Sequence, residues 1–270
     1  METGAITEYI DVAQLVLYVF WAFFFGLIVY LRREDRREGY PLENEKGPGA
    51  DPGFLFVPRP KTFVPLHGDH VVSKPDGARD TRSLAAHPAA PWPGAPLVPE
   101  GDPMQAGVGP GAWAERADVP DLTVDGAPKI VPLRAAPGFG VEARDPDPRG
   151  MTVYGCDGVA GGVVRDLWLD RADVMFRYLE VEVAAEVGAG AAAEAGGEQP
   201  LRSILLPVNF AQVDGARRRV RVLAVKGEHF AGAPVRRESD QVTLLEEERA
   251  VAYFGAGFLY ADRARQEPLL

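Results

Sequence analysis

Three charged residues beside a predicted turn are the strongest candidates for chemistry in this chain. Asp170 and Asp173 flank a turn between two predicted strands, and Arg177 follows shortly after. Carboxylates within hydrogen-bond reach of water can pass protons when burial or neighbouring charge raises their pKa values. The same residues also fit an ordinary solvated turn, and their spacing alone does not separate a proton relay from that alternative.

The sequence indicates neither an active site nor a metal centre. It contains no nucleophile elbow, phosphate-binding loop or dinucleotide-binding fingerprint. Of the four histidines only His67 and His70 lie close together, in a Pro/Gly-rich stretch without a carboxylate or thiol cluster. Cys156 is the single cysteine and cannot form an intrachain disulfide. We predict no catalytic residue, no metal site and no enzymatic activity in this chain alone.

The charge balance restricts the class of partner. The formal net charge is -10 at pH 7, whereas nucleic-acid binding needs a basic surface that faces the phosphates. We therefore expect no nucleic acid among the partners.

A long uncharged run near the N-terminus predicts a membrane-spanning helix. Residues 12–31 contain no charged side chain, and as a helix they extend about 30 Å, the thickness of a bilayer core. Asp11 can cap the first turn, with Gln14 reaching back to its backbone N–H. A signal peptide is disfavoured because no Lys or Arg precedes the run. A buried core helix is disfavoured because such a helix is rarely apolar on every side.

Basic residues flank only one end of this helix and set its expected orientation. Four arginines follow the run and none precedes it: Arg32, Arg33, Arg36 and Arg37. By the positive-inside rule, residues 1–11 lie outside the cytoplasm and the rest of the chain lies inside it. We expect the four arginines to form a belt that pairs with anionic lipid headgroups. One helix face either contacts lipid or packs against other spanning helices; it carries Gln14, Tyr18, Trp21, Phe25 and Ile28.

Proline dominates the stretch that follows. Twenty of the 24 prolines lie between Pro41 and Pro148, and proline excludes long helices and central strands. Disorder is one interpretation of such a composition. The other is an ordered irregular segment that lies along a partner protein. Large apolar side chains favour the second interpretation: Trp92, Met104, Val108 and Trp113.

Beyond residue 151 the pattern changes to short strands and a final helix. Four segments have the length and apolar content of strands: residues 163–169, 177–183, 204–206 and 220–225. Strands at this spacing predict a small antiparallel barrel, with the Ala/Gly-rich residues 188–197 as a hairpin loop. A capping box of Thr243 and Glu246 predicts a helix to about Phe254. We expect Gly255 and Gly257 to end it.

Eight short segments, in order along nearly the whole chain, point to a known family. The most specific is LRREDRREGYPLE at 31–43, directly after the spanning run. The others are PKTF at 60–63, GDPM at 101–104, GVGP at 107–110, DPDPRGM at 145–151, DLWLD at 166–170, RYLEVE at 177–182 and QVTLLEE at 241–247. Together they resemble the H subunit of the photosynthetic reaction centre of purple bacteria. Residues 158–170 also resemble the PRC-type barrel of that family.

The resemblance implies an architecture and a set of partners. The fold is expected to be one transmembrane helix, a mainly β cytoplasmic domain with a PRC-type antiparallel barrel, and a C-terminal helix. Such a subunit binds no pigment itself, caps the L and M subunits, stabilises the complex and shields the quinone sites. The implied complex holds bacteriochlorophyll, bacteriopheophytin, quinones and non-haem iron on other subunits. It lies in the bacterial inner or intracytoplasmic (chromatophore) membrane, with a cytochrome subunit and the light-harvesting antenna as further expected partners.

The resemblance also gives individual residues a role. Asp170 and Asp173 correspond to carboxylates that conduct protons to the secondary quinone. A supporting charge network corresponds to Asp121, Arg177 and Glu247. Some relatives have a histidine pair as the proton inlet, where this chain has residues 125–128. Proline at 128 cannot titrate, so the inlet must differ in this chain, and Asp125 is a candidate for it.

The expected domains follow the same order along the chain. We predict a periplasmic N-terminus (1–11), a transmembrane helix (12–31), an extended irregular segment (32–120), a PRC-barrel-like domain (121–262) and a C-terminal tail (263–270). A membrane-anchored adaptor, with the same barrel but no proton-relay role, remains the alternative function.

Overall fold

The computed structural model describes residues 11–40, 56–67, 72–78, 81–92, 94–184 and 201–266. The chain divides into two compact units, residues 1–81 and 82–270, and each is described by itself. The predicted hairpin loop at 188–197 lies outside the described residues.

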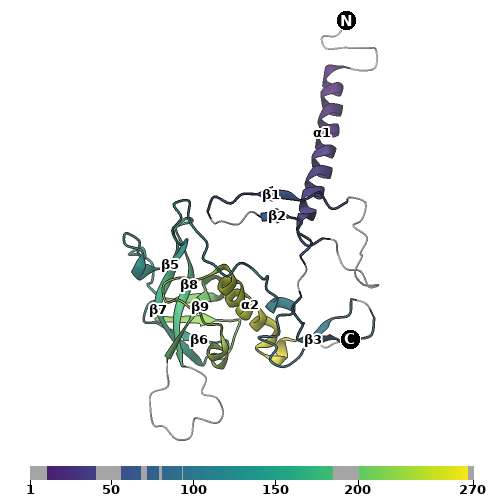
Figure 1. The fold of residues 1–270 in the computed structure, drawn as a ribbon. Coiled ribbons are helices and arrows are strands. Elements are labelled where there is room, and N and C mark those ends of the chain that lie inside the picture. Colours follow the sequence, from purple (N-terminus) through teal and green to yellow (C-terminus); the bar gives the residue numbers. More distant parts are fainter. Residues whose placement is uncertain are drawn as a thin grey trace, which may run out of the picture. The chain divides into compact units, whose positions relative to one another are not determined.

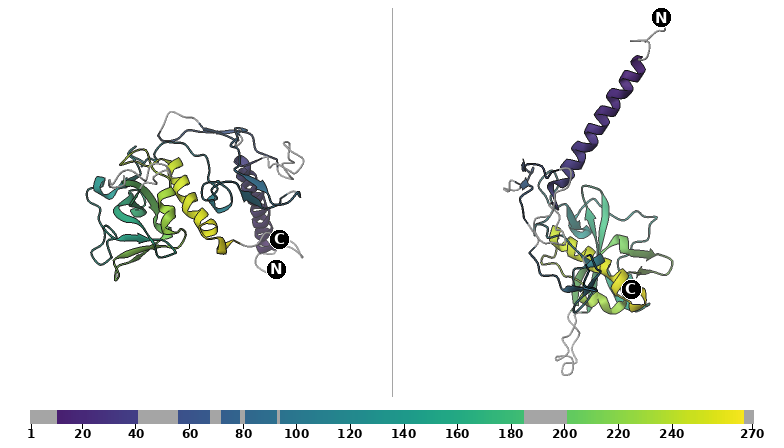
Figure 2. Two further views of the ribbon diagram at one scale, coloured as in Figure 1. Left: turned by 90° about the horizontal axis from the view of Figure 1, so that it is seen from below. Right: turned by 90° about the vertical axis from the view of Figure 1, so that its right-hand side faces the viewer.

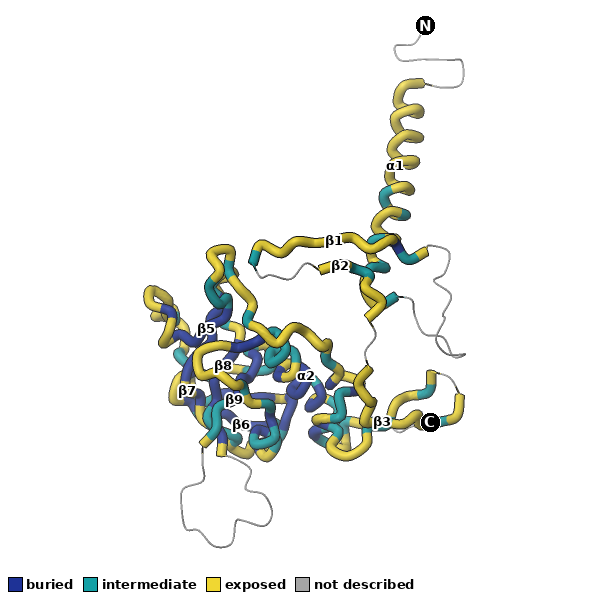
Figure 3. The backbone as a smooth tube through the Cα atoms, viewed as in Figure 1, coloured by how far each residue is buried: buried dark blue, intermediate teal, exposed yellow. Residues whose placement is uncertain are grey.

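The first unit contains one long apolar helix, α1 (Val12–Glu34). Asp11 caps it as predicted, since its carboxylate accepts a hydrogen bond of 2.7 Å from the backbone N–H of Gln14. No residue of α1 is buried within the chain, and its apolar window has a mean hydropathy of 2.3. The continuous exposed surface of this helix, yellow along most of its length in Figure 3, is suited to lipid. The helix extends past residue 31, because Arg32 and Arg33 form its last turn.

Short elements follow α1 in the first unit. A 3-10 turn, η1 (Asp35–Arg37), continues directly from the helix. Strand β1 (Lys61–Phe63) then pairs antiparallel with β2 (Val72–Lys74). Within the predicted irregular stretch, the chain thus forms a two-stranded ladder of three residues on each side.

The second unit is built on a seven-stranded sheet with the order β10-β11-β6-β7-β8-β9, and β5 pairs with β7. Figure 1 labels β5, β6, β7, β8 and β9 of this sheet. The strands are β5 (Ile130–Pro132), β6 (Thr152–Tyr154), β7 (Ala160–Asp170), β8 (Met175–Ala184), β9 (Leu201–Pro207), β10 (Ala211–Asp214) and β11 (Arg219–Val222). A separate ladder joins β3 (Ala86–Pro88) and β4 (Leu97–Pro99). Short 3-10 turns connect these elements: η2 (Gly109–Gly111), η3 (Leu133–Ala135), η4 (Val208–Phe210), η5 (Gly227–Gly232) and η6 (Arg263–Arg265).

The predicted fold class is confirmed, with two differences in the sheet. β7, β8 and β9 contain the predicted strands, and β11 covers the first part of 220–225. However, β11 pairs with β6 in parallel, and no pairing among the described residues joins β9 to β10, so the sheet is open. The parallel pair arises because β9 continues through η4 into β10, and the β10–β11 hairpin then delivers β11 in the direction of β6.

Helix α2 (Leu244–Tyr260) begins as predicted and ends later than predicted. Thr243 and Glu246 form the capping box, which satisfies two backbone N–H groups of the first turn. The expectation that Gly255 and Gly257 end the helix is wrong, because both lie inside it. A Cβ atom at Gly255 would lie 2.8 Å from the carbonyl oxygen of Pro110, and one at Gly257 would lie 2.6 Å from a neighbouring carbonyl oxygen. These glycines permit close packing of backbones and do not act as a stop signal.

The main core lies between the sheet and α2, which packs along one side of it in Figures 1 and 2. Leu179, Phe230 and Phe254 are fully buried there. Met104 and Val108 are also buried, at 6% and 3% exposure. These two apolar side chains were expected to contact another protein, but they pack within their own unit. Their hydrophobic surface is thus removed from water without a partner.

Candidate functional site

Four of the predicted site residues line one hollow of about 240 Å³ in the second unit. It lies where β5, the β7–β8 turn and the start of α2 meet. The predicted residues on its wall are Asp121, Asp170, Arg177 and Glu247. The structure therefore brings together side chains that are separated by more than 120 positions in the sequence.

Lys129, which the sequence analysis did not single out, is the centre of this cluster. Its Nζ lies 3.4 Å from Asp170 Oδ2, 3.7 Å from Asp173 Oδ2 and 3.8 Å from Asp121 Oδ2. Burial disfavours the charged amine, but the nearby carboxylates outweigh it and hold the pKa of Lys129 above its ordinary value. One cation is thus shared by three carboxylates.

The β7–β8 turn holds Asp170 and Asp173 in different environments. Asp170 is 1% exposed, and its Oδ1 accepts hydrogen bonds from the backbone N–H groups of Ala172 and Asp173. Its Oδ2 is buried, accepts no hydrogen bond from the described residues and interacts with the ammonium group of Lys129 through an ion pair. The side chain of Asp173 is 55% exposed. A purely solvated turn describes Asp173 but not Asp170.

The backbone of this turn is strained at its last residue. Val174 has φ +52°, in the left-handed region that β-branched residues rarely adopt. Such strain persists only where the surrounding contacts fix the chain, and it concentrates at functional positions. Here it follows directly after Asp173 and sets the return of the chain into β8.

Glu247 adds an acid that can hold a proton. Its Oε2 accepts a hydrogen bond of 2.6 Å from the hydroxyl of Tyr178. Burial raises the pKa of Glu247. The hydrogen bond from Tyr178 and the charge of Arg177 lower it, but the net pKa still lies above its ordinary value. Burial beside Glu247 likewise raises the pKa of Tyr178. Arg177 itself is exposed and acts on Glu247 through its charge.

Asp125, the predicted inlet, does not line this hollow. It lies exposed in the tight turn between Leu122 and Pro128, which form an isolated β-bridge. The structure therefore separates it from the group around Lys129. Its role as an inlet stays a prediction.

A second acidic cluster, missed by the sequence analysis, lies on the same pair of strands. Glu180 of β8 is 1% exposed and accepts hydrogen bonds from Arg134 (2.7 Å), Trp168 (2.9 Å), Ser203 (2.9 Å) and Arg236 (2.7 Å). Burial alone would raise the pKa of Glu180, but these donors outweigh it and lower the pKa to about 2. Glu180 is therefore a permanently ionised structural group.

The same network binds a second acid and orders a distant loop. Arg134 also donates to Asp166 Oδ2 (3.0 Å), to Asp240 Oδ1 (2.8 Å) and to the backbone carbonyl of Ser239 (2.7 Å). Arg236 lies over the ring of Trp168, with its guanidinium carbon 4.9 Å from the ring centroid. Glu180 falls within the predicted strand at 177–183, and its neighbours in the sequence do not show that it meets Arg134 and Arg236.

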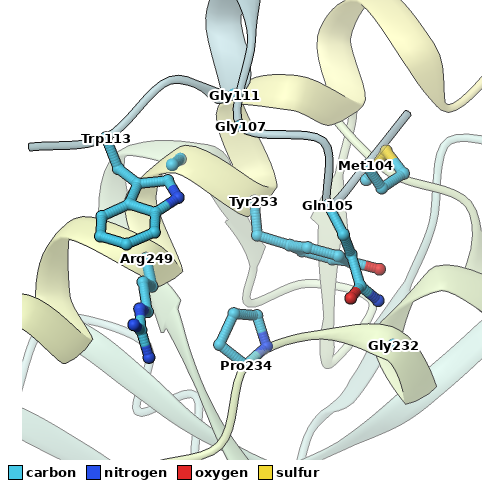
Figure 4. Close-up of a pocket in the computed structure, with 10 residues that line it drawn as sticks. Met104, Gln105, Gly107, Gly111, Trp113, Gly232, Pro234, Arg249 and Tyr253 are labelled. Carbon is cyan, nitrogen blue, oxygen red and sulfur yellow. The ribbon is translucent and has the colours of Figure 1, made fainter. Parts of the chain in front are cut away.

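A further hollow, of about 300 Å³, lies between residues 104–113 and α2 (Figure 4). Trp113 and Tyr253 stand on its wall, and Arg249 lies below the indole in this view. The guanidinium carbons of Arg82 and Arg249 are 4.0 and 4.8 Å from the Trp113 ring centroid. Trp113, expected to contact a partner, thus lies against two cations of its own unit.

The predicted arginine belt divides into exposed and engaged members. Arg32 and Arg33 are exposed on the last turn of α1. Arg37 pairs with Glu34 at 2.8 Å, and its Nη1 donates to the backbone carbonyls of Arg59 (2.9 Å) and Lys74 (3.1 Å). Its side chain is only 15% exposed. Arg37 therefore joins the end of the helix to the β1–β2 ladder.

The apolar helix α1 fits a membrane-anchored protein, and residues 140–229 match the PRC-barrel domain family. Residues 4–135 match the family of the photosynthetic reaction centre, H-chain N-terminal region. The chain belongs to the H subunits of photosynthetic reaction centres. It is a structural subunit of the reaction-centre complex.

Proposed function

We propose that this subunit caps the cytoplasmic face of the L and M subunits, shields the quinone sites and conducts protons to the secondary quinone. The observation that supports proton conduction is the group of three aspartates that share Lys129, next to a glutamate whose pKa is raised. A relay needs acids that exchange protons near neutral pH and are in contact with water. The hollow that Asp170 and Glu247 line is the proposed place of that contact.

Within the proposed relay, Asp173 receives protons from solvent and Asp170 passes them inward. The exposed carboxylate of Asp173 and the buried carboxylate of Asp170 are both within 3.7 Å of the Lys129 ammonium group. The lysine holds the two acids close together and moderates their repulsion. Glu247 and Tyr178 form a side branch that stores a proton.

The test is the rate of proton-coupled transfer of the second electron to the secondary quinone. We expect Asp173→Asn to slow this step about tenfold or more at neutral pH, because the amide cannot accept a proton. The doubly substituted Asp170→Asn/Asp173→Asn complex is expected to be slower still, with primary charge separation unchanged. Asp173 is the informative single variant, since Asp170 also caps the turn.

Asp147→Asn is the matched control, because Asp147 is a partly exposed aspartate that pairs with Arg149 and does not line the hollow. Its second-electron rate is expected to equal that of the wild type. A wild-type rate in the double variant would remove the relay role and leave a scaffold.

The proposed membrane arrangement places residues 1–11 in the periplasm and the second unit in the cytoplasm. The arginines after α1 support this orientation through the positive-inside rule. The proposed complex carries bacteriochlorophyll, bacteriopheophytin, quinones and non-haem iron on other subunits, and contacts a cytochrome subunit, the antenna and lipid. Purification in mild detergent tests this: bacteriochlorophyll absorbance should co-elute with the chain, whereas a colourless complex would favour the adaptor alternative.

A further inference from the structure

An arginine-rich corner lies in the second unit, away from the carboxylate hollow. Four arginines fall between residues 217 and 221, in a chain whose formal net charge is -10. They stand around a hollow of about 730 Å³, whose charged and aromatic lining consists of Tyr154, Asp157, Arg217, Arg218, Arg219 and Arg221. A cluster of cations around a hollow creates a local positive potential that attracts anions, even in a protein whose net charge is negative.

Strand pairing points two of these arginines to one outer face. Along β11, Val220 and Val222 are fully buried, so Arg219 and Arg221 lie on the opposite side of the strand. The parallel pairing with β6 sets Tyr154 beside Arg221. A phenolic hydroxyl and two guanidinium groups are thus offered by one face of the sheet.

Intramolecular ion pairs satisfy only half of the arginines. Arg217 and Arg219 share Asp214, at 3.2 and 3.3 Å. Arg218 and Arg221 have no acidic group within 4.0 Å in the part of the chain that the structure describes. Two positive charges on the wall of the hollow are therefore left without a counterion from the protein.

The backbone at one of these two arginines, Arg218, is strained. Arg218 has φ +47°, a conformation that glycine or asparagine adopts far more readily. A long cationic side chain in a strained turn, next to a hollow, suggests that the side chain serves a purpose other than folding.

The single carboxylate on the wall is turned toward the backbone. Asp157 accepts hydrogen bonds from the backbone N–H groups of Val159 (3.1 Å) and Gly227 (3.1 Å). Its negative charge remains, but Asp157 forms no ion pair with an arginine among the described residues, and the four arginines on the wall outnumber it.

We propose that this hollow binds a phosphate-bearing ligand with at least two negative charges. The planar guanidinium group binds phosphate oxygens through two parallel hydrogen bonds, and a neighbouring hydroxyl adds a further donor. The hollow is larger than one phosphate group, which suits a polyphosphate or a phospholipid headgroup with its glycerol. This proposal is independent of the proton relay, because the two sites have no lining residue in common.

Isothermal titration of the full chain in a neutral detergent, at low ionic strength, tests the proposal with pyrophosphate as the probe. We expect saturable binding with one ligand per chain. The variant Arg218→Ala/Arg221→Ala should weaken it at least about tenfold, through the loss of charge-assisted hydrogen bonds. The variant Arg218→Lys/Arg221→Lys keeps the positive charge but loses the planar guanidinium group that forms two parallel hydrogen bonds. It should therefore bind with intermediate affinity.

Short-chain phosphatidylglycerol, added below its micelle-forming concentration, separates the two sources of phosphate. Competition with pyrophosphate would assign the site to a headgroup, and pyrophosphate binding without competition would assign it to a soluble phosphate compound. Arg263→Ala, a change at an exposed arginine of η6, is the matched control and should bind like the wild type. The proposal is overturned if neither probe binds, or if a double alanine variant with unchanged circular dichroism binds as tightly as the wild type.

Discussion

The two acidic clusters beside the β7–β8 pair each contain one carboxylate residue that is 1% exposed, Asp170 or Glu180, but the groups around these two acids have opposite electrostatics. Around Glu180, two arginines, an indole N–H and a hydroxyl saturate one carboxylate and hold its pKa at about 2. Around Lys129, one ammonium group is shared by three aspartates, and the pKa of the neighbouring Glu247 is raised. The supply of donors, and not burial alone, decides whether a buried acid is a fixed charge or a proton carrier.

Removal of an arginine from the saturated cluster should give the largest effect. Arg236 and Glu180 have side chains only 7% and 2% exposed, so Arg236→Ala removes one of the two cations that offset the charge of a buried carboxylate. We expect the free energy of unfolding to fall by roughly 3 kcal/mol or more. Urea unfolding of the full chain in detergent, followed by near-ultraviolet circular dichroism, measures this change.

Arg165→Ala is the matched control for Arg236→Ala. Arg165 pairs with Glu182 on the same two strands, but its side chain is 57% exposed. Its loss should cost less than about 1 kcal/mol. Equal effects of the two substitutions would contradict the distinction between the clusters.

The two glutamates should give opposite dependences of stability on pH. The folded-state pKa of Glu180 lies below its ordinary value of 4.5, so its stabilisation is present above pH 4.5 and is lost as the pH falls toward 2. The folded-state pKa of Glu247 lies above 4.5, so its contribution is complete below that pH and is lost as the pH rises through the raised pKa. Each slope is at most about 1.4 kcal/mol per pH unit.

Single substitutions separate these contributions in the pH profile of unfolding. Glu180→Gln should remove the loss of stability that occurs as the pH falls from 4.5 toward 2. Glu247→Gln should remove the loss of stability that occurs as the pH rises above 4.5. Glu142→Gln, at an exposed glutamate, should change neither slope. If Glu247→Gln left the profile unchanged, Glu247 would not differ from a solvated acid.

Relief of the strained turn should give the smallest effect. Val174 is 65% exposed at φ +52°, so Val174→Gly removes strain with little loss of packing. We expect a gain of about 1 kcal/mol in the free energy of unfolding, after the entropy cost of glycine. Ala172→Gly in the same turn has no such strain to relieve and should lose about 0.5–1 kcal/mol. A loss in both variants would show that the turn is unstrained.

The sequence predicted the elements with strong local signals. The charge-free run, the Asp11 cap and the capping box at Thr243 each depend on residues within one or two turns. The long strands were found by their apolar content. In contrast, Gly255 and Gly257 were misinterpreted, because a local rule treats glycine as a terminator while here it permits contact with a distant backbone.

The candidate site could be predicted only in part, for the same reason. Asp170 and Asp173 are neighbours in sequence, and the family resemblance supplied Glu247. Lys129 and Arg134 come from elements far along the chain, and no local pattern reveals that they meet acids of β7 and β8. Likewise, Met104 and Val108 were expected to contact a partner, because the sequence does not show that both become buried within their own unit.

The guanidinium group of Arg37 couples the membrane to the first elements outside it. It holds Glu34 on the last turn of α1 and two carbonyl groups beside and within the β1–β2 ladder. A transmembrane helix adjusts its tilt when the thickness of the surrounding bilayer changes. Because Arg37 joins the helix to the ladder, we expect the β1–β2 ladder to follow a change in helix tilt, so that lipid composition alters the protein surface near the headgroups.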